Sequence, residues 1–441
     1  MSFPRYPKYT DSGVKWLGEV PDHWNAVRLK TLLAEVDERA EDQHLELLGL
    51  SKAVGVVRRS ELEQNASESD DHAKYKVADA GHLVMNKMQA WNGVFGLSPM
   101  RGMVSPDYAV FRFLQHGFDE FLCSLFRTEM MAGVFFMRCR GMGTAFLRLN
   151  SPDLLDIKVP LPTAEDAKRI SAFLYQETAK IDALVVDQHR LIELLKEKRQ
   201  AVISSAVTKG LNPDAPVKPS GIEWLGEVPM TWTVTKLGRV AFMQEGPGLR
   251  NWQFTADGTR VICVTNITEH GIDFRRLEKF ISIDEYNSSY RHFTVTTGDV
   301  LLSSSGNSWG KVAIYEGEEE VILNTSTIRL NELERRPLIR DFLAILLQSD
   351  TAREQLGLAM TGSCQPNFGP THLSGIIVAV PSVQEQSDIV AFVARGTATL
   401  DALTAEAERA IALLQERRAA LISAAVTGKI DVRGLVNTEA A

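Results

Sequence analysis

The sequence has few of the features that mark membrane, secreted or disulfide-bonded proteins. Its 441 residues include four cysteines and no CxxC pair; the cysteines are Cys123, Cys139, Cys263 and Cys364. Scattered cysteines of this kind are typical of reduced thiols in a cytoplasm. No apolar run approaches the roughly 20 residues that span a bilayer. The opening residues, MSFPRYPKYTDSGVKW, contain no apolar segment typical of a secretory signal. We therefore expect a cytoplasmic protein.

Catalytic motifs are also missing from the sequence. Adenine methyltransferases hold the flipped base with an Asn/Asp-Pro-Pro-aromatic turn, and the nearest string, at 212–215, lacks the second proline and the aromatic residue. The run Gly306–Lys311 is one residue short of P-loop spacing, and Val312 stands where Ser or Thr is required. The histidines show no HExxH pattern. We therefore predict that the chain has no catalytic residues and no metal site.

An excess of basic residues is missing as well. The 48 Lys and Arg are outnumbered by 56 Asp and Glu, which gives a net charge of −8. DNA-binding domains are usually basic, and a chain that neutralises few phosphates binds DNA weakly without sequence preference. Small clusters such as Arg58-Arg59, or Arg138 with Arg140, are either solvated surface or isolated phosphate contacts. If the chain binds DNA, partner subunits must supply much of the electrostatic attraction.

The most prominent feature of the sequence is an internal duplication. Residues 162–208 recur as residues 381–427 at a constant offset of 219. Ile181-Asp182-Ala183-Leu184 matches Leu400-Asp401-Ala402-Leu403, and Ala206-Val207-Thr208 matches Ala425-Val426-Thr427. After its first residue, neither copy contains a proline. A shared register over this length indicates duplication rather than chance.

Each copy is predicted to form one long helix. Alternating steps of four and three residues pass through apolar positions, which is typical of a helix whose apolar seam faces another helix. These positions are Ile170, Leu174, Ile181, Leu184, Leu191 and Leu195 in the first copy, and Ile389, Val393, Leu400, Leu403, Leu414 and Leu421 in the second. We expect the two copies to pack against each other in antiparallel orientation. Two ordinary core helices in unrelated bundles are the alternative.

A second repeat precedes each half of the chain. Residues 12–21, with the sequence SGVKWLGEVP, recur as residues 220–229, SGIEWLGEVP, at an offset of 208. Trp16 and Trp224 in this box are expected to be core anchors. The regions between box and helix mix short strand-like runs with a helical stretch, which favours α/β (α+β) domains. We therefore predict two globular mixed α/β domains separated by two long antiparallel coiled-coil helices, with internal pseudo-two-fold symmetry.

This organisation resembles the specificity subunits of type I restriction–modification systems. The resemblance rests on the Trp-Leu-Gly-Glu-Val-Pro boxes, the repeated helix residues, and the segments Ser105–Tyr108 and Gly298-Asp299, and it covers essentially the whole chain. One departure is Glu165-Asp166 in the first helix, where the second has the more typical Glu385-Gln386. The resemblance implies target-recognition domains at 1–158 and 211–378, conserved long helices at 159–210 and 379–430, and a C-terminal tail at 431–441.

The resemblance also implies partners and cofactors. The partners would be double-stranded DNA, two methyltransferase subunits docked on the helices and boxes, and restriction subunits that combine motor and nuclease. S-adenosylmethionine, ATP and Mg would bind those partners, with no cofactor in this chain. A coiled-coil scaffold that joins proteins without DNA is the competing hypothesis, and the missing motifs disfavour a single-chain restriction enzyme.

Two loops offer groups that could read base edges. Each follows a predicted strand at matching places in the two halves and combines amide, hydroxyl, ammonium and aromatic groups. The candidate DNA-binding residues are Asn86, Lys87, Gln89, Trp91 and Asn92 in the first loop, Ser303, Ser305, Asn307, Ser308, Trp309 and Lys311 in the second, and Arg58, Arg140, Gln365 and Asn367 elsewhere. Ordinary polar hairpin loops are the alternative explanation.

Overall fold

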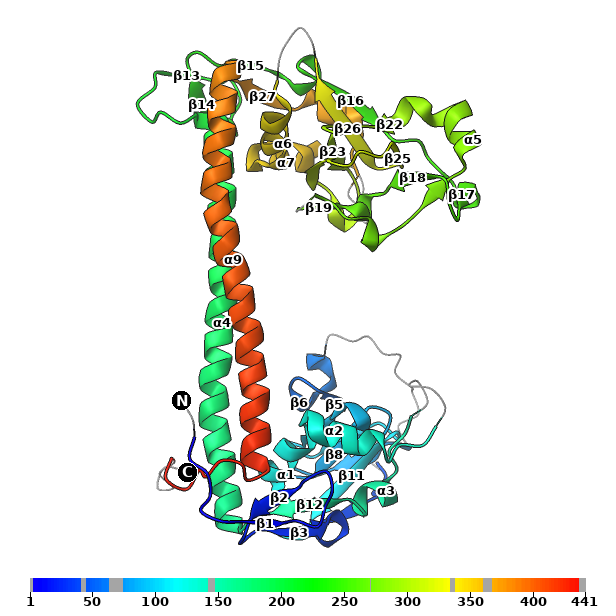
Figure 1. The fold of residues 1–441 in the computed structure, drawn as a ribbon, viewed down its shortest axis with the longest axis vertical. Helices are drawn as coiled ribbons and strands as arrows, with labels where there is room; N and C mark the ends of the chain where they lie inside the picture. Colours follow the sequence, from blue (N-terminus) through cyan, green and yellow to red (C-terminus); the bar gives the residue numbers. More distant parts are fainter. Residues whose placement is uncertain are drawn as a thin grey trace. The chain divides into compact units, whose positions relative to one another are not determined.

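The computed structural model describes residues 3–40, 45–62, 74–141, 147–269, 271–333, 338–359 and 367–435 (Figure 1). The chain forms two compact units, one of Met1–Gln188 with Arg409–Ala441 and the other of His189–Glu408. Two long helices, α4 (Ala164–Lys209) and α9 (Val383–Val426), each contribute one half to each unit. Each unit therefore combines one α/β domain with two half-helices. The consecutive segment boundaries read from the sequence remain a prediction.

The first domain is built on a four-stranded antiparallel sheet. The strand order is β4 (Leu33–Val36), β11 (Tyr108–Phe113), β8 (Leu83–Asn86) and β9 (Phe95–Leu97). Helices α1 (Asp119–Phe126) and α2 (Glu129–Phe136) pack on it through buried aromatic residues. The rings of Phe126 and Phe135 lie 5.2 and 5.0 Å from that of Phe95. Such aromatic contacts contribute beyond the area that they bury.

The second domain repeats this sheet in the same order. Its strands are β16 (Ala241–Glu245), β26 (Thr327–Glu332), β23 (Val300–Ser303) and β24 (Val312–Ile314), followed by α6 (Arg340–Gln348) and α7 (Asp350–Ala359). A five-stranded sheet is added to it, with the order β17 (Phe254–Thr255), β21 (Phe280–Ile281), β18 (Thr259–Ile262), β25 (Val321–Leu323) and β22 (Thr294–Val295). The two domains thus share one design although their sequences differ.

Short elements complete each unit. In the first they are β1 (Tyr9–Asp11), β2 (Glu19–Pro21), β3 (Asn25–Arg28), β5 (Leu48–Ser51), β6 (Gly55–Arg58), β7 (Lys76–Ala78), β10 (Gly102–Val104), α3 (Ser151–Leu155) and β12 (Lys158–Leu161). In the second they are β13 (Val217–Pro219), β14 (Glu227–Pro229), β15 (Thr233–Lys236), β19 (Ile267–Thr268), β20 (Gly271–Ile272), α5 (Ile283–Glu285), α8 (Pro370–Gly375) and β27 (Ile377–Val380). In both units the strand after the box pairs with the strand before the long helix, β3 with β12 and β15 with β27.

Each box forms a hairpin with the three residues that precede it, β1–β2 in the first unit and β13–β14 in the second. The tryptophans that follow the boxes, Trp24 and Trp232, are buried. The expectation that Trp224 is a core anchor is wrong, because 47% of its surface is exposed. The tryptophan that closes the box, rather than the one within it, supplies the buried aromatic ring.

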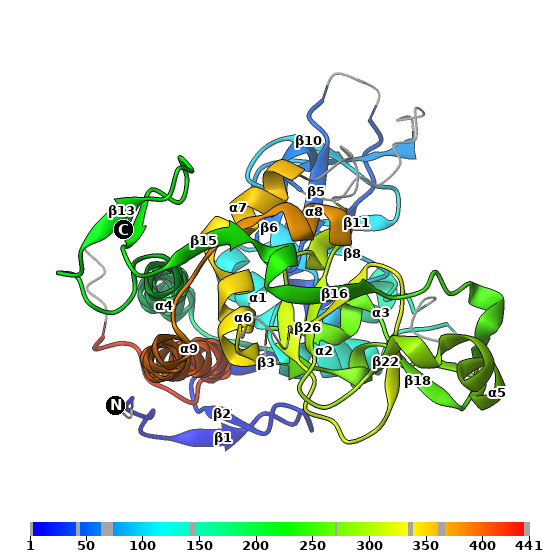
Figure 2. The ribbon, with the colours of Figure 1, turned by 90° about the horizontal axis from the view of Figure 1, so that it is seen from above.

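Helices α4 and α9 pack together in antiparallel orientation, as the sequence predicts (Figures 1 and 2). In the first unit Arg418 of α9 pairs with Asp182 of α4 at 2.8 Å, and in the second Arg199 of α4 pairs with Asp401 of α9 at 2.9 Å. Both pairs join residues that match at the offset of 219. The duplication in sequence is therefore also a duplication of contacts.

The predicted seam is correct at most of its positions and wrong at three of them. Leu184, Leu191 and Leu403 are 48, 42 and 44% exposed, whereas Ile192 and Ile411 are buried. The other predicted seam residues are buried as expected, and Leu414 is partly buried. The buried ones are Ile170, Leu174, Ile181 and Leu195 in α4, and Ile389, Val393, Leu400 and Leu421 in α9. The buried Ile192 lies one residue after the predicted Leu191, and a step of one residue turns the side chain by about 100° around the helix. Both registers contain apolar residues, so the pattern alone could not separate them.

Candidate nucleic-acid interface

The two candidate loops leave equivalent strands of the two sheets. The first loop follows β8, whose last residue Asn86 pairs with Tyr108 of β11. The second follows β23, whose last residue Ser303 pairs with Thr327 of β26. Each loop then returns into the edge strand of its sheet, β9 or β24. The structure therefore presents both loops at the same end of the same kind of sheet.

The same pair of backbone hydrogen bonds holds each loop. In the first domain the amide of Lys87 donates to the carbonyl of Asp107 at 3.4 Å, and the carbonyl of Lys87 accepts from the amide of Leu149 at 3.0 Å. In the second, the amide of Ser304 donates to the carbonyl of Ser326 at 2.9 Å, and its carbonyl accepts from Phe368 at 3.2 Å. Leu149 and Phe368 match at the offset of 219. Lys87 and Ser304 are thus equivalent residues in the two domains.

Several polar groups of the first loop support the loop itself. The Asn86 side chain accepts a hydrogen bond from the amide of Met88 at 3.0 Å, and the Trp91 indole donates to the carbonyl of Met88 at 2.9 Å. The side-chain oxygen Oδ1 of Asn92 accepts a hydrogen bond from Nζ of Lys52 at 2.9 Å. Gln89 is exposed. These bonds preorganise the loop and leave fewer of its side chains free for a ligand.

A mixed charge cluster lies beside this loop. Burial, together with the positive charge of Lys76, lowers the pKa of Lys87 below its ordinary value. Arg148 lies 3.7 Å from Asp107, the residue whose carbonyl accepts from Lys87. Arg140 pairs with Asp153 at 2.8 Å and is joined to Arg148 by a β-bridge. Lys87, Arg140 and Arg148 therefore gather at one place, as a nucleic-acid interface requires.

Arg58 is placed elsewhere in the first domain. It ends β6 and pairs in register with Leu48, at the end of the β5–β6 hairpin away from Lys52, which contacts Asn92. The structure does not bring Arg58 to the loop, although the residue is exposed.

The second loop gathers residues from four parts of the chain. Ser305 forms a β-bridge with Asn367, and the carboxylate of Glu245 accepts from the amide of Ser326 at 3.2 Å. Ser326 has a φ of 63°, a conformation uncommon for residues other than glycine. Ser303 is fully buried, and its hydroxyl has no hydrogen-bond partner among the described residues. Ser303 thus faces the domain interior, whereas Ser305 and Asn367 remain at the surface.

The remaining candidates of the second domain are placed as follows. Ser308, Trp309 and Lys311 are partly buried in the loop, and the backbone of Asn307 lies within it. The Asn307 side chain and the whole of Gln365 lie outside the described residues.

The sequence reasoning left out Lys52, Asp107, Arg148 and Glu245 as site residues. Lys52 and Asp107 in turns, and Glu245 at the end of β16, are distant in sequence from the loops that they support, so no local pattern marks them. The sequence does contain a pattern that marks Arg148, because this residue matches the candidate Asn367 at the offset of 219. Applying the duplication residue by residue would have found it.

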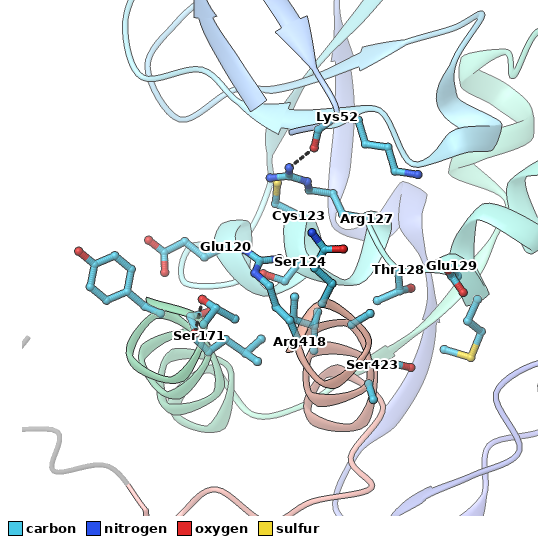
Figure 3. Close-up of a pocket in the computed structure, with 18 of the residues that line it drawn as sticks. Lys52, Glu120, Cys123, Ser124, Arg127, Thr128, Glu129, Ser171, Arg418 and Ser423 are labelled. Atoms are coloured by element: carbon cyan, nitrogen blue, oxygen red, sulfur yellow. Dashed lines mark hydrogen bonds between the residues drawn. The ribbon is translucent and has the colours of Figure 1, made fainter. Parts of the chain in front are cut away.

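A cavity of about 880 Å³ lies in the first unit between α1, α2 and the two long helices (Figure 3). Arg127 and Lys52 meet at its edge, where the guanidinium donates to the Lys52 carbonyl. Burial raises the pKa of the Cys123 thiol in this wall to about 11. The thiol is therefore protonated at neutral pH, and a protonated thiol is a poor nucleophile.

Within the described ranges, no three His, Cys, Asp or Glu side chains gather in a group that could hold a metal ion. No helix in the described part of the chain combines the length and apolar character that crossing a membrane requires.

The arrangement of the two domains and their loops defines a class of protein. It is a two-domain protein whose halves present loops of the same design on one duplicated pair of helices.

Comparison with known proteins identifies the class more closely. Residues 229–411 match the family model of the type I restriction modification DNA specificity domain. The type I restriction enzyme MjaVIII specificity subunit of Methanocaldococcus jannaschii is 23% identical over 303 residues, 68% of either chain. The EcoBI specificity subunit of Escherichia coli is 24% identical over 300 residues, 65% of this chain and 61% of that protein.

Two solved structures show the same fold. A chain from a structural study of complex assembly and conformational transition in a type I R-M system superposes with a TM-score of 0.70 at 17% identity, over 93% of this chain and 99% of that one. The HsdS subunit of Thermoanaerobacter tengcongensis superposes with a TM-score of 0.50 at 16% identity, over 96% and 100%. Residues 229–411 are thus similar to the type I restriction modification DNA specificity domain, and the chain as a whole is similar to type I specificity subunits.

Proposed function

We propose that this chain is the DNA sequence-specificity subunit of a type I restriction–modification complex and that each domain reads one half of a bipartite, interrupted site. The observation that carries the proposal is the equivalence of Lys87 and Ser304, held by the same backbone hydrogen bonds at the ends of identically ordered sheets. The match of residues 229–411 to a DNA specificity domain favours this function over a scaffold without DNA.

The subunit itself is proposed to be non-catalytic. S-adenosylmethionine, ATP and Mg would bind the partner subunits, and this chain would supply recognition alone. The basic residues Lys87, Arg140 and Arg148, which lie together beside the first loop, fit a binding role. We place the complex in the cytoplasm, where chromosomal DNA and reduced thiols occur together.

The partners are proposed to be restriction subunits and two methyltransferase subunits, the latter docked on the helix pair. Two symmetry-related positions support this number. Leu184 and Leu403 are both exposed, and so are Leu194 and Leu413, and each pair matches at the offset of 219. Exposed leucines retained at the same positions of both helices fit two copies of one partner on equivalent surfaces.

The function is tested with the purified chain, its methyltransferase subunit and DNA of mixed sequence. We expect transfer of radiolabelled methyl groups from S-adenosylmethionine only when both subunits are present, at one interrupted site. Methyl transfer or DNA cutting by the chain alone would contradict the non-catalytic assignment. Methylation that does not depend on the chain would contradict the specificity role.

A further inference from the structure

A hollow of about 980 Å³ opens in the second unit beside the end of α4. Its walls are the last turns of α4, the linker 210–217, the second box, and Phe392 from α9. Four large apolar side chains on these walls are exposed: Leu211, Val217, Trp224 and Phe392. Lys198, Lys209, Glu223 and Glu227 line it with balanced charge. The hollow is within the size range of ligand pockets, and its exposed surface is apolar and aromatic.

The corresponding place in the first unit is filled. Phe173 is the counterpart of Phe392 at the offset of 219, yet it is only 3% exposed, against 44% for Phe392. The ring of Phe3 packs edge-on against Phe173, with centroids 5.4 Å apart. Both residues belong to a core cluster that includes Leu17 of the first box and Leu421 of α9. An aromatic residue on an extended segment of the chain therefore occupies this place in the first half.

The chain's connectivity explains the difference. In the first unit two separate segments reach the helix end, the N-terminal residues and the segment that follows α9. They meet where the amide of Asp431 donates to the carbonyl of Pro4 at 2.8 Å, and Tyr9 donates to the carbonyl of Gly428 at 3.0 Å. In the second unit a single linker joins α4 to the second box. It takes the place of both the N-terminal segment and the segment after α9. At the position of Phe3, at the box offset of 208, it carries the shorter Leu211.

We propose that this hollow is a docking site for an aromatic side chain carried on an extended segment of the methyltransferase subunit. The proposal rests on the proposed function for the identity of the partner and on the packing of Phe3 for the chemistry of the bound group. The site belongs to the second half alone, because the first half fills its equivalent with its own residues. It therefore gives the two otherwise equivalent halves different contacts with their partners.

The chemistry is tested first, with a synthetic peptide of residues 2–10 (SFPRYPKYT) as the probe. Titrated calorimetrically into the full chain, it should bind at one site. Binding should weaken at least about tenfold for the Phe3→Ala peptide, and equally for the native peptide with the Phe392→Ala chain, as expected for loss of a buried aromatic side chain. Absence of binding at millimolar peptide, or binding that is insensitive to both substitutions, would overturn the assignment.

The partner is tested by closing the hollow from within. Leu211→Phe gives the linker the side chain that fills the first half, so the variant should fold with an unchanged or raised Tm. It should bind the methyltransferase subunit at least about tenfold more weakly at one of its sites. Ile283→Phe, at an exposed position on α5 outside the hollow, is the matched control and should bind like the wild type.

The outcomes separate this inference from the proposed function. Site-specific methylation by the wild-type complex, with unchanged partner affinity in Leu211→Phe and Phe392→Ala, would leave the function standing and overturn the docking site. A methyltransferase subunit that neither binds the chain nor needs it for methylation would overturn the proposed function, and the docking assignment with it, whatever the peptide does.

Discussion

The guanidinium Nε of Arg199 on α4 lies 2.9 Å from the carboxylate of Asp401 on α9. The duplication carries Arg199 to Arg418 and Asp401 to Asp182, and these two residues pair at 2.8 Å in the other unit. In one ion pair the arginine comes from the first copy of the repeat and the aspartate from the second. In the other ion pair the two copies exchange these roles. Both pairs fix the same antiparallel register of the helices, which is the feature that makes one half of the chain the counterpart of the other.

Reversing one charge in such a pair should destabilise the protein, and reversing both should restore it. We expect Arg199→Asp to lower the free energy of unfolding by about 1 kcal/mol or less, because both side chains are partly exposed to solvent, which screens the ion pair. Arg199→Asp with Asp401→Arg should recover most of the loss. Urea denaturation of this double-mutant cycle, at low and high salt, measures the coupling. A coupling of zero at low salt would show that the pair does not fix the register.

The register of the seam can be tested with two neighbouring residues. Ile192 is buried and Leu191 is 42% exposed. Ile192→Ala should cost about 2–4 kcal/mol because it leaves a cavity between the helices, whereas Leu191→Ala should cost less than about 1 kcal/mol. The same order is expected in α9 for Ile411→Ala, at a buried position, and Leu403→Ala, at a position that is 44% exposed. Equal losses for Ile192→Ala and Leu191→Ala in denaturant titrations would contradict the observed seam.

These helices also show what could be predicted from the sequence. Their existence, pairing and antiparallel sense follow from the repeat, because a periodic apolar pattern over 46 residues of α4 has few other solutions. The sequence could not show which residue between Ile181 and Leu195 lies in the seam. Leu191 and Ile192 are both apolar, and only packing against the partner helix determines which of them is buried. Likewise, the candidate loops lie at equivalent sheet ends, but their supports, such as Asp107 in a turn and Glu245 at the end of β16, come from distant parts of the sequence.

The equivalent residues Arg148 and Asn367 provide a paired test of recognition. Each stands beside its loop, bridged to Arg140 or to Ser305. We expect Arg148→Ala to weaken or relax recognition of one half-site, and Asn367→Ala that of the other, each by about 1–3 kcal/mol. Arg112→Ala, at an exposed position in β11, is the control and should change neither. Competition binding of the methyltransferase complex to DNA with single-base changes measures the effect. Loss at both half-sites from one substitution would contradict one reader per half-site.

If the helix pair sets the distance between half-sites, lengthening both helices should lengthen the gap. Seven residues inserted after Arg190 and after Arg409, midway between the two ion pairs, preserve the heptad seam. They add about 10.5 Å of helix, close to three base pairs at about 3.4 Å each. Methylome sequencing should show a gap longer by about three base pairs with both half-sites unchanged. An active complex with the original gap would mean that the helices do not set the spacing.

The central claim is that the two domains read the two half-sites independently. The direct measurement is methylome sequencing of a host in which residues 25–161 are replaced by the corresponding segment of a relative. These limits exchange β3 and β12 together, because the two strands pair with each other. We expect one half of the methylated site to change and the other half and the gap to stay the same. A change in both halves, or in neither while methylation persists, would contradict it.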